Sequence, residues 1–302
     1  MILSYHPCFY GDRFRLYAGR ELDEKDTALM RRASAVILPP GRLPGLYREA
    51  VSCCANVFPD YSSRYRYPGK PGDIRLFREH GLPHPGTDIF EHTRDCLPGY
   101  LESINYPVMI KHSAGGEGSL VYRADNPAEA AKVLGVFNGM EKSGIQGFLV
   151  QKALDAGNRT LRVVVIHEHL YSYWRVQPQA GKVQHNLAQG GFVDFYSDPE
   201  LQEKGRSLVQ KLCAASGINL AGIDVLFDHA GPGEPVPMLL EINFFFGLQG
   251  LGGLEGYHKL LKEGVRDWIL QRGLRLPPKD FPGSRCGTGS SSLVQSHFKE
   301  DS

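Results

Sequence analysis

The chain has 302 residues, which is enough for two or three packed subdomains and more than one compact core usually holds. Its 34 lysines and arginines nearly balance 33 aspartates and glutamates, so no overall field favours nucleic acid or a membrane surface as a partner. The six cysteines form no Cys-x-x-Cys pair, and no run of about 20 apolar residues could span a membrane. Without a signal-peptide pattern at the N-terminus, a cytoplasmic enzyme is expected.

The first third of the chain, residues 1–95, is expected to form a small α/β unit. Residues 36–38 are a short apolar run typical of a buried strand, and residues 46–54 are helical in character. A second helix is predicted over about 73–80. It should end at Gly81, because glycine tolerates the left-handed conformation that closes a helix.

From about residue 104 the pattern changes to short strands separated by turns. Strands are predicted over 106–111 and 120–123, and Asn126 is expected to cap a helix that follows them. The later elements are expected in this order: strands over 148–154, 161–166 and 170–176, a helix that Asp198 caps and Gly217 ends, and a helix over 259–271. Residues 277–302 are rich in Pro, Gly and Ser and are expected to be a disordered tail.

The strongest chemical signal is a predicted β-hairpin around the Gly-Pro-Gly turn at 231–233. Symmetric pairing about this turn places Asp224 directly opposite Glu241, with Asn243 on the same face. Opposed carboxylates repel each other, and a divalent cation relieves the repulsion; oxygen ligands suit Mg²⁺ or Mn²⁺ rather than zinc. A solvent-facing hairpin with incidental carboxylates is the alternative. The other face is predicted to pack in the core and carries Ile223, Val225, Phe227, Met238, Leu240 and Ile242.

A second signal is a lysine at a strand end that precedes a glycine-rich loop. Lys111 supplies a fixed positive charge, and Gly115, Gly116 and Gly118 would let backbone N–H groups close around phosphate oxygens. The segment lacks the Gly-Lys-Ser/Thr sequence of a Walker motif. A flexible hairpin tip is the alternative interpretation.

Two arginines form a third signal. A symmetric turn near residues 168–169 places Arg162 opposite Arg175, and two adjacent cations favour an anion such as phosphate or carboxylate between them. Two solvated arginines on an exposed face are the alternative. The polar stretch at 185–191, His-Asn-Leu-Ala-Gln-Gly-Gly, has the composition of a loop when it is considered alone.

Together and in this order, these segments resemble the ATP-grasp superfamily, closest to its glutamate-ligase and glutathione-synthetase (RimK-type) branch. The resemblance covers about residues 70–268. It implies an α/β (α+β) ATP-grasp fold in which two α+β subdomains clasp ATP. The expected division is a small α/β domain over 1–95, then the ATP-grasp domain over 96–276 with a lid subdomain over about 104–147.

The resemblance also implies a role for each matching residue. Nucleotide binding is implied for Lys70, Lys111, Ser113, Gly115, Gly116, Gly118, Gln151, Lys152, Leu154 and Asp155. Metal binding is implied for Asp224, Glu241 and Asn243, and catalytic roles for Arg162, Arg175 and Asn186, which begins an Asn-Leu-x-x-Gly-Gly stretch.

The sequence departs from the family pattern at three places. Thr160 stands where an acidic residue usually precedes the first arginine, and Lys152 stands where Glu is common, so ribose binding would fall to Asp155. Residues 244–246 are three phenylalanines in place of small residues or proline. These departures leave the fold expectation intact and leave the substrate open.

The implied reaction is ATP-dependent ligation of a carboxylate to an amine through an acylphosphate, with release of ADP and phosphate. The expected cofactors are ATP and Mg²⁺ (or Mn²⁺), and the expected substrates are small carboxylates and amines or a peptide or protein terminus. Neither nucleic acid nor a membrane is expected as a partner, and a homodimer is common in the family. An ATP-grasp phosphotransferase and a non-catalytic nucleotide-binding protein remain the alternatives.

Overall fold

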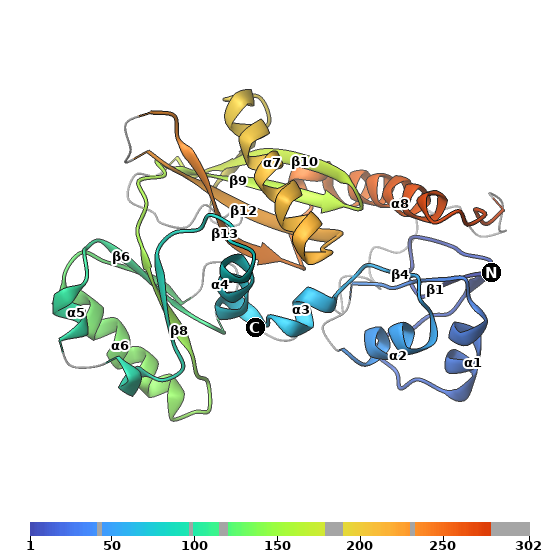
Figure 1. Ribbon diagram of the computed structural model, residues 1–302, viewed down its shortest axis with the longest axis horizontal. Helices are drawn as coiled ribbons and strands as arrows, with labels where there is room; N and C mark the ends of the chain where they lie inside the picture. The colour runs from blue at the N-terminus through green and yellow to red at the C-terminus, as the bar shows by residue number, and fades with distance from the viewer. Residues whose placement is uncertain (41–43, 97–98, 115–119, 179–189, 230–232, 279–302) are drawn as a thin grey trace.

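The computed structural model describes residues 1–40, 44–96, 99–114, 120–178, 190–229 and 233–278. Its strands form three sheets, which follow one another along the chain and lie in separate parts of the molecule (Figure 1). No helix in those ranges combines the length and the hydrophobicity needed to cross a bilayer. Nearly all of the predicted tail, from residue 279 onward, lies outside the described residues.

The first sheet is parallel and has the strand order β2-β1-β3-β4. Helix α1 carries the chain from β2 across to β3, and α2 supplies the crossover between the parallel neighbours β3 and β4. Met30 of α1 and Ala50 of α2 are fully buried in the same core cluster, which anchors both helices. The predicted strand at 36–38 and helix at 46–54 are confirmed within one residue. The bounds are β1 (Ile2–Ser4), β2 (Arg13–Phe14), α1 (Glu24–Arg32), β3 (Ala35–Ile37), α2 (Gly45–Cys53) and β4 (Val57–Phe58).

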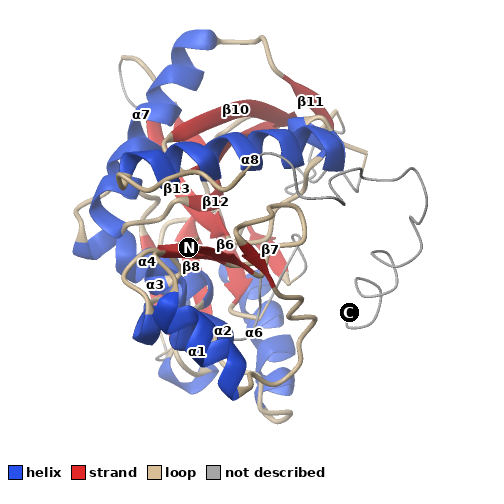
Figure 2. Ribbon diagram, turned by 90° about the vertical axis from the view of Figure 1, so that its right-hand side faces the viewer, coloured by secondary structure: helices blue, strands red, loops and turns tan. Residues whose placement is uncertain are grey.

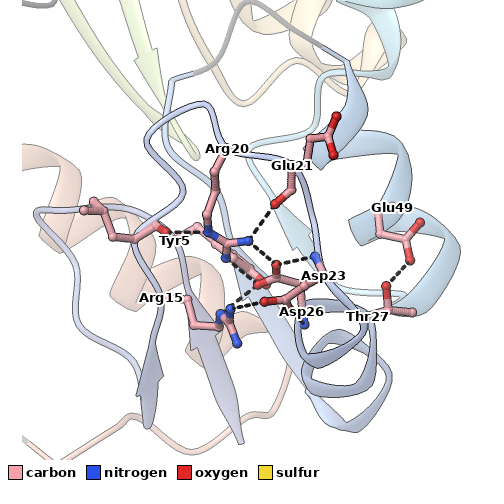
Figure 3. Close-up of polar contacts among 9 residues, drawn as sticks. Tyr5, Arg15, Arg20, Glu21, Asp23, Asp26, Thr27 and Glu49 are labelled. Atoms are coloured by element: carbon pink, nitrogen blue, oxygen red, sulfur yellow. Dashed lines mark hydrogen bonds and ion pairs between the residues drawn. The ribbon is translucent and has the colours of Figure 1, made fainter.

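A buried aspartate ties α1 to the first sheet (Figure 3). The Asp26 side chain has no exposed surface; Arg15 Nε lies 2.8 Å and Arg20 Nη1 2.6 Å from its carboxylate oxygens. The Tyr5 hydroxyl donates to Asp26 at 3.0 Å, and Asp23 caps α1 by accepting from the Asp26 amide. Burial raises the pKa of Asp26, but these donors and charges outweigh it and hold the pKa well below its usual range.

The second sheet is antiparallel and has the strand order β5-β8-β6-β7. It carries α6, whose Phe137 is fully buried, and α6 begins as predicted, with Asn126 accepting from the Glu129 amide at 3.0 Å. Because β5 joins this sheet, the sheet begins before residue 95, where the first domain was expected to end. The bounds are β5 (Thr87–Phe90), η1 (Thr93–Asp95), α5 (Tyr100–Ser103), β6 (Val108–His112), β7 (Val121–Ala124), α6 (Pro127–Glu141) and β8 (Phe148–Lys152).

The third sheet is antiparallel, has the strand order β11-β10-β9-β12-β13, and is covered on both faces. Val163 of β9 packs in one cluster with Leu212 of α7, whereas Val164 packs in another with Val265 of α8. Figure 2 shows α8 running across the sheet that contains β10, β12 and β13. The bounds are β9 (Arg159–Ile166), β10 (His169–Val176), β11 (Phe192–Asp194), α7 (Pro199–Ser216), β12 (Leu220–Asp228), β13 (Val236–Asn243), η3 (Gln249–Leu251) and α8 (Gly253–Gln271).

Two short helices, α3 (Ser62–Arg66) and α4 (Gly69–Glu79), connect the first sheet to the second. Helix α4 begins four residues before the predicted start. Its backbone then reaches Gly81 at φ +61°, as expected for a glycine past a helix end.

One side of α4 and the loop after it cover the outer edge of β13. The Leu239 amide donates to the Pro83 carbonyl at 2.9 Å, and the Ile242 amide donates to Asp73 Oδ2 at 3.1 Å. Asp73 is buried, and burial raises its pKa well above the usual range. The strand that carries Glu241 and Asn243 is therefore fixed from outside the sheet.

The start of α7 differs from the prediction. Asp198 adopts the left-handed conformation with φ +47° and makes no side-chain cap; its carboxylate pairs instead with Arg159 Nη1 at 2.5 Å. The Asp198 carboxylate was predicted to accept hydrogen bonds from the first amides of α7, and it pairs with Arg159 instead. The predicted end at Gly217 is confirmed, with φ +75°.

Candidate active site

The centre of the candidate site is a row of side chains on three adjacent strands of the third sheet. Arg162 of β9 pairs with Asp224 of β12, and Asp224 pairs on its other side with Glu241 of β13. Arg162 Nε lies 2.6 Å from Asp224 Oδ1, and Arg175 Nη2 lies 2.7 Å from Asp224 Oδ2. The Asp224 side chain is 3% exposed, so its carboxylate contacts the two arginines rather than bulk water.

The two arginines meet at Asp224, but the prediction that they lie directly opposite each other is wrong. Arg162 pairs with Tyr173, and Arg175 pairs with Thr160. The turn between β9 and β10 contains only His167 and Glu168, because Ile166 and His169 already pair with each other. The observed register therefore differs by two residues from the register predicted from the sequence. A shift of two leaves both side chains on the same face of the sheet, so they still converge.

Arg162 and Arg175 determine the protonation state of the Asp224 carboxyl group. Burial raises the pKa of Asp224, but the charges of Arg162 and Arg175 and their hydrogen bonds outweigh burial and lower the pKa. Gly222 makes room for one of them, because a Cβ at this position would lie 2.8 Å from Arg162 Nη1. Asp224 is therefore ionised and fixed in place at neutral pH.

The predicted pairing of Asp224 with Glu241 is confirmed, but the hairpin is not symmetric throughout. A β-bulge between Asp224 and Val225 shifts the remaining pairs by one residue, so Val225 faces Leu239. A one-residue shift turns side chains to the opposite face. Leu239 therefore enters the core, and the prediction that Met238 and Leu240 do so is wrong.

The other two candidate metal ligands lie beside Asp224. Asn243 Nδ2 is 3.3 Å from Asp224 Oδ2, so the amide nitrogen faces the aspartate. Glu241 is half-buried and makes no hydrogen bond or ion pair within the described ranges. Its carboxylate is thus available to a ligand.

Lys111 brings a buried positive charge from the second sheet to this row. Its Nζ donates to Gln151 Oε1 at 2.7 Å, and Gln151 Nε2 donates to Thr87 Oγ1 at 2.9 Å. Burial lowers the pKa of Lys111 to about 8; the negative charges of Glu241 and Asp224 oppose this effect. Lys111 is therefore within electrostatic range of the carboxylates of the third sheet.

Lys70 approaches the same place from the first turn of α4. Its charge lowers the pKa of Lys111 further, so the two lysines are within electrostatic range of each other. A Cβ at Gly69 would lie 3.7 Å from the Ser113 carbonyl, so the start of α4 adjoins the chain after β6. The Ser113 amide donates to the Gly147 carbonyl at 2.9 Å, and its hydroxyl donates to the Gln146 carbonyl.

The residues predicted to hold adenine and ribose lie at the end of β8 and just beyond it. Lys152 Nζ is 3.7 Å from Asp228 Oδ2, and its side chain is 57% exposed. Leu154 is half-buried and Asp155 is exposed, with Asp155 Oδ1 3.4 Å from the Gly157 amide. All three lie within four residues of Gln151, which accepts a hydrogen bond from Lys111. Gly115, Gly116, Gly118 and Asn186 lie outside the described residues.

The donor set fits a hard divalent cation in part. Glu241 and Asn243 offer a carboxylate and an amide oxygen, which suit Mg²⁺ or Mn²⁺. Asp224, by contrast, already accepts from two arginines, so its oxygens are shared. No cluster of three His, Cys, Asp or Glu suited to a metal occurs in the described part of the chain.

A phosphate group would find a donor at Arg175. Its Nε is buried and has no hydrogen-bond partner among the residues that the structure describes. Buried donors are almost always paired in proteins, so this one points to a ligand. Together with Arg162, Lys70 and Lys111, Arg175 gives the site four cationic side chains near the carboxylate row.

Sequence reasoning missed three contributors to the site. Asp73 fixes the Ile242 amide between Glu241 and Asn243, and Thr87 anchors Gln151. Gly250 sits against the Tyr173 ring, where a Cβ would lie 2.2 Å from Cζ. Each contact joins segments far apart in the chain. Only Asp73 offered a signal in the sequence, because it begins the helix predicted over about 73–80 and follows Lys70 by three residues.

The three phenylalanines after Asn243 divide between packing and exposure. Phe244 packs against Tyr61, with ring centroids 6.2 Å apart, and Phe246 packs against Tyr257 at 5.8 Å. Phe245 is 43% exposed and lies under the guanidinium of Arg64, 4.6 Å from the ring centroid.

Known proteins similar to this chain include probable alpha-L-glutamate ligases. A probable alpha-L-glutamate ligase 2 from Hahella chejuensis is 27% identical over 207 residues, which cover 68% of this chain and 63% of the relative. A probable alpha-L-glutamate ligase from Hydrogenovibrio crunogenus is 29% identical over 260 residues, covering 83% of this chain and 76% of the relative. This chain thus spans less than two thirds of the first relative and about three quarters of the second.

Solved structures agree on the fold. A RimK-domain ATP-grasp protein from Sphaerobacter thermophilus has a TM-score of 0.56 at 14% identity, covering 89% of this chain and 99% of the other. D-alanine–D-alanine ligase from Bacillus anthracis has a TM-score of 0.54 at 12% identity, covering 86% and 84%. The predicted ATP-grasp fold is confirmed. A RimK-like ATP-grasp domain matches residues 70–257, more than half of the sequence, and the chain belongs to that family.

Proposed function

We propose that this chain is an ATP-dependent carboxylate–amine ligase that works through an acylphosphate and releases ADP and phosphate. The observation that carries the proposal is the row Arg162–Asp224–Glu241, which Lys111 approaches from the second sheet. Buried cations and carboxylates at one point suit the transfer of a phosphoryl group. The curated relatives, named as probable alpha-L-glutamate ligases, support the same reaction class.

ATP is the proposed cofactor. The ATP-grasp fold is shared with an N5-carboxyaminoimidazole ribonucleotide synthetase solved as an ADP complex, at a TM-score of 0.54. We assign the phosphates to Lys70, Lys111, Ser113 and the loop with Gly115, Gly116 and Gly118. We assign adenosine to the chain from Gln151 to Asp155, mainly through the backbone, since Gln151 holds Lys111.

Phosphoryl transfer requires positioning and charge neutralisation more than covalent chemistry from the protein. Lys70, Lys111 and Arg175 would neutralise the charge that develops on the transferred group. Arg162, held by Asp224, would orient the phosphate or the second substrate, and Asn186 keeps the catalytic role that the family resemblance implies. None of these side chains needs to act as a nucleophile.

A divalent cation fits beside these residues. Glu241 and Asn243 would hold it, with Asp224 as a shared ligand, and when bound it would withdraw negative charge from the transferred group. The half-buried Glu241 carboxylate, which has no partner in the described chain, would provide the main contact.

The substrates are proposed from chemistry and from the names of relatives. L-Glutamate is the first amino acid to test, because the curated relatives are named for it. The second substrate is a small carboxylate or amine, or the terminus of a peptide.

The test is ADP release from Mg-ATP with L-glutamate and a panel of amino acids, dipeptides and carboxylates, followed by mass spectrometry of the products. A product with the summed mass of acid and amine less water supports ligation, whereas a phosphorylated product would indicate a phosphotransferase. Glu241→Ala is expected to abolish ADP release. The matched control is Glu234→Ala on the same hairpin, where the side chain is 78% exposed and pairs with Lys204. Full activity in Glu241→Ala would disprove the metal assignment.

A further inference from the structure

A second group of reactive side chains lies at the carboxyl end of β1, outside the residues assigned to ATP. The chain places β2 on one side of β1 and then crosses over to place β3 on the other side. In open parallel sheets, ligands bind beyond the carboxyl ends of the strands, where the chain reverses direction in this way. His6 and Cys8 follow β1 at this position.

The main contact joins Cys8 to a histidine at the start of α8. Cys8 Sγ lies 2.9 Å from His258 Nε2, and both residues are half-buried. Burial, with a smaller effect from the charge of Lys262, lowers the pKa of His258. The ring is therefore neutral near pH 7 and can accept the thiol proton, as the base does in a nucleophile–base pair.

His6 completes the group. The Cys8 amide donates to His6 Nδ1 at 3.1 Å, and His6 Nε2 is buried without a hydrogen-bond partner among the described residues. Burial, with an added effect from His258, lowers the pKa of His6 to about 4. A neutral imidazole with an unused ring nitrogen therefore lies against the backbone of Cys8, where it could hydrogen-bond to an incoming group.

The other described cysteines are in different surroundings. Burial raises the pKa of the Cys54, Cys96 and Cys213 thiols, to about 12 for Cys213. Cys53 Sγ donates to Glu49 Oε1 at 3.6 Å, so its partner is a carboxylate and not an imidazole. Among the described cysteines, only Cys8 has an imidazole within hydrogen-bond distance.

The same contact connects the first sheet to the candidate active site. Tyr257, which precedes His258, packs against Phe246 with ring centroids 5.8 Å apart. Phe246 also closes over Gly222, where a Cβ would lie 2.9 Å from Phe246 Cβ and 2.8 Å from Arg162 Nη1. A group attached to Cys8 would displace His258 and disturb packing that reaches Arg162.

We propose that Cys8 is a modification site at which a low-molecular-weight disulfide attaches and lowers the activity of the enzyme. His258 Nε2 takes the thiol proton, and Cys8 Sγ attacks one sulfur of the disulfide. A new S–S bond forms at Cys8 as the old one breaks, and the second half of the reagent leaves as a thiolate. The thiolate takes up a proton, so the reagent is reduced as Cys8 is oxidised.

The test of reactivity uses the full chain without substrates. Reduced protein is incubated with glutathione disulfide, and peptide mass spectrometry follows each cysteine separately. Cys8 is expected to react at least about tenfold faster than Cys53, and His258→Gln is expected to remove that difference. His169→Gln, at an exposed histidine paired with Asp267, is the control and should leave the rates unchanged. Equal rates at Cys8 and Cys53, or an unchanged Cys8 rate in His258→Gln, would overturn the proposal.

The test of the consequence is ADP release before and after modification. The modified protein is expected to lose most of its activity and to regain it with dithiothreitol. Cys8→Ser keeps a hydroxyl donor for His258, so it should be active and insensitive to glutathione disulfide. Full activity of the modified protein would also overturn the proposal. The labelling rates do not depend on ligation, so a failure of the proposed function is recognised separately.

Discussion

Asp26 and Asp224 have almost the same immediate surroundings and belong to different kinds of site. Each is buried, and each carboxylate is held by two arginines at 2.6–2.8 Å. Around Asp26 the partners form a closed set, with Tyr5 and the α1 cap completing it. Around Asp224 the set stays open, because Arg175 Nε lacks a partner in the described chain and Glu241 is unpaired there.

This difference teaches how to separate a structural ion cluster from a binding site. Burial and a shifted pKa are common to both, since ion pairs that only support the fold also shift pKa values. The distinguishing features are unused donors and acceptors, together with further cations such as Lys111 that arrive from another subdomain. Asp26 has all its partners in the first part of the chain, whereas the Asp224 row keeps an unpaired carboxylate at Glu241 and an unused donor at Arg175 among the described residues.

The largest expected effects come from replacing each aspartate by its neutral isostere. Asp224→Asn should reduce ADP release about 100- to 1000-fold, because the arginines and the cation lose their shared partner. Asp26→Asn should lower the free energy of unfolding by about 3 kcal/mol, as expected when a buried pair is broken, and leave the activity of the folded protein unchanged. Urea unfolding and ADP release measure the two effects. Loss of activity in folded Asp26→Asn would remove the distinction.

A smaller effect is expected from pH, through Lys111. Its pKa is lowered to about 8, so the lysine is charged below this pH and loses its charge as the pH rises above it. The KM for ATP should therefore rise by about tenfold per pH unit above pH 8. Lys111→Arg should flatten the profile, because arginine remains charged. A wild-type KM that stays constant from pH 7 to 9.5 would contradict the placement of Lys111 at the phosphates.

The smallest expected effects come from conservative changes of one arginine in each cluster. Arg175→Lys removes the buried Nε donor and should raise the KM for ATP by about tenfold. Arg20→Lys keeps the charge at a side chain that is 33% exposed and should lower the melting temperature only slightly. Steady-state kinetics and thermal unfolding of both variants test this contrast. Equal effects on KM would show that Arg175 is structural.

The sequence predicted the carboxylate row because its turn is visible in the composition. Glycine and proline mark residues 231–233, so the pairing of Asp224 with Glu241 follows from the spacing. The bulge beside Asp224 carries no such mark, and the predicted core positions of β13 were wrong for that reason. The turn between β9 and β10 places His167, a non-glycine residue, at φ +58°, which no pattern in the sequence signals.

Contacts between distant segments were beyond prediction from one sequence. Gln151 was expected to lie in a strand that contacts adenine mainly through its backbone, and the contacts of its side chain with Lys111 and Thr87 were not predicted. The contact of Cys8 with His258 joins residues 250 positions apart. Local patterns indicate which face of a strand is polar, and only the packing of whole sheets decides which polar groups meet.

The cover that α4 and Pro83 place over β13 has a consequence for solubility. An uncovered edge strand presents unpaired amides and carbonyls, which act as a template for strands of other chains and lead to aggregation. Here the Leu239 and Ile242 amides are already occupied from outside the sheet. The strand that carries the candidate metal ligands is thereby protected from intermolecular β-pairing, and damage to the α4 contact would favour self-association of the chain.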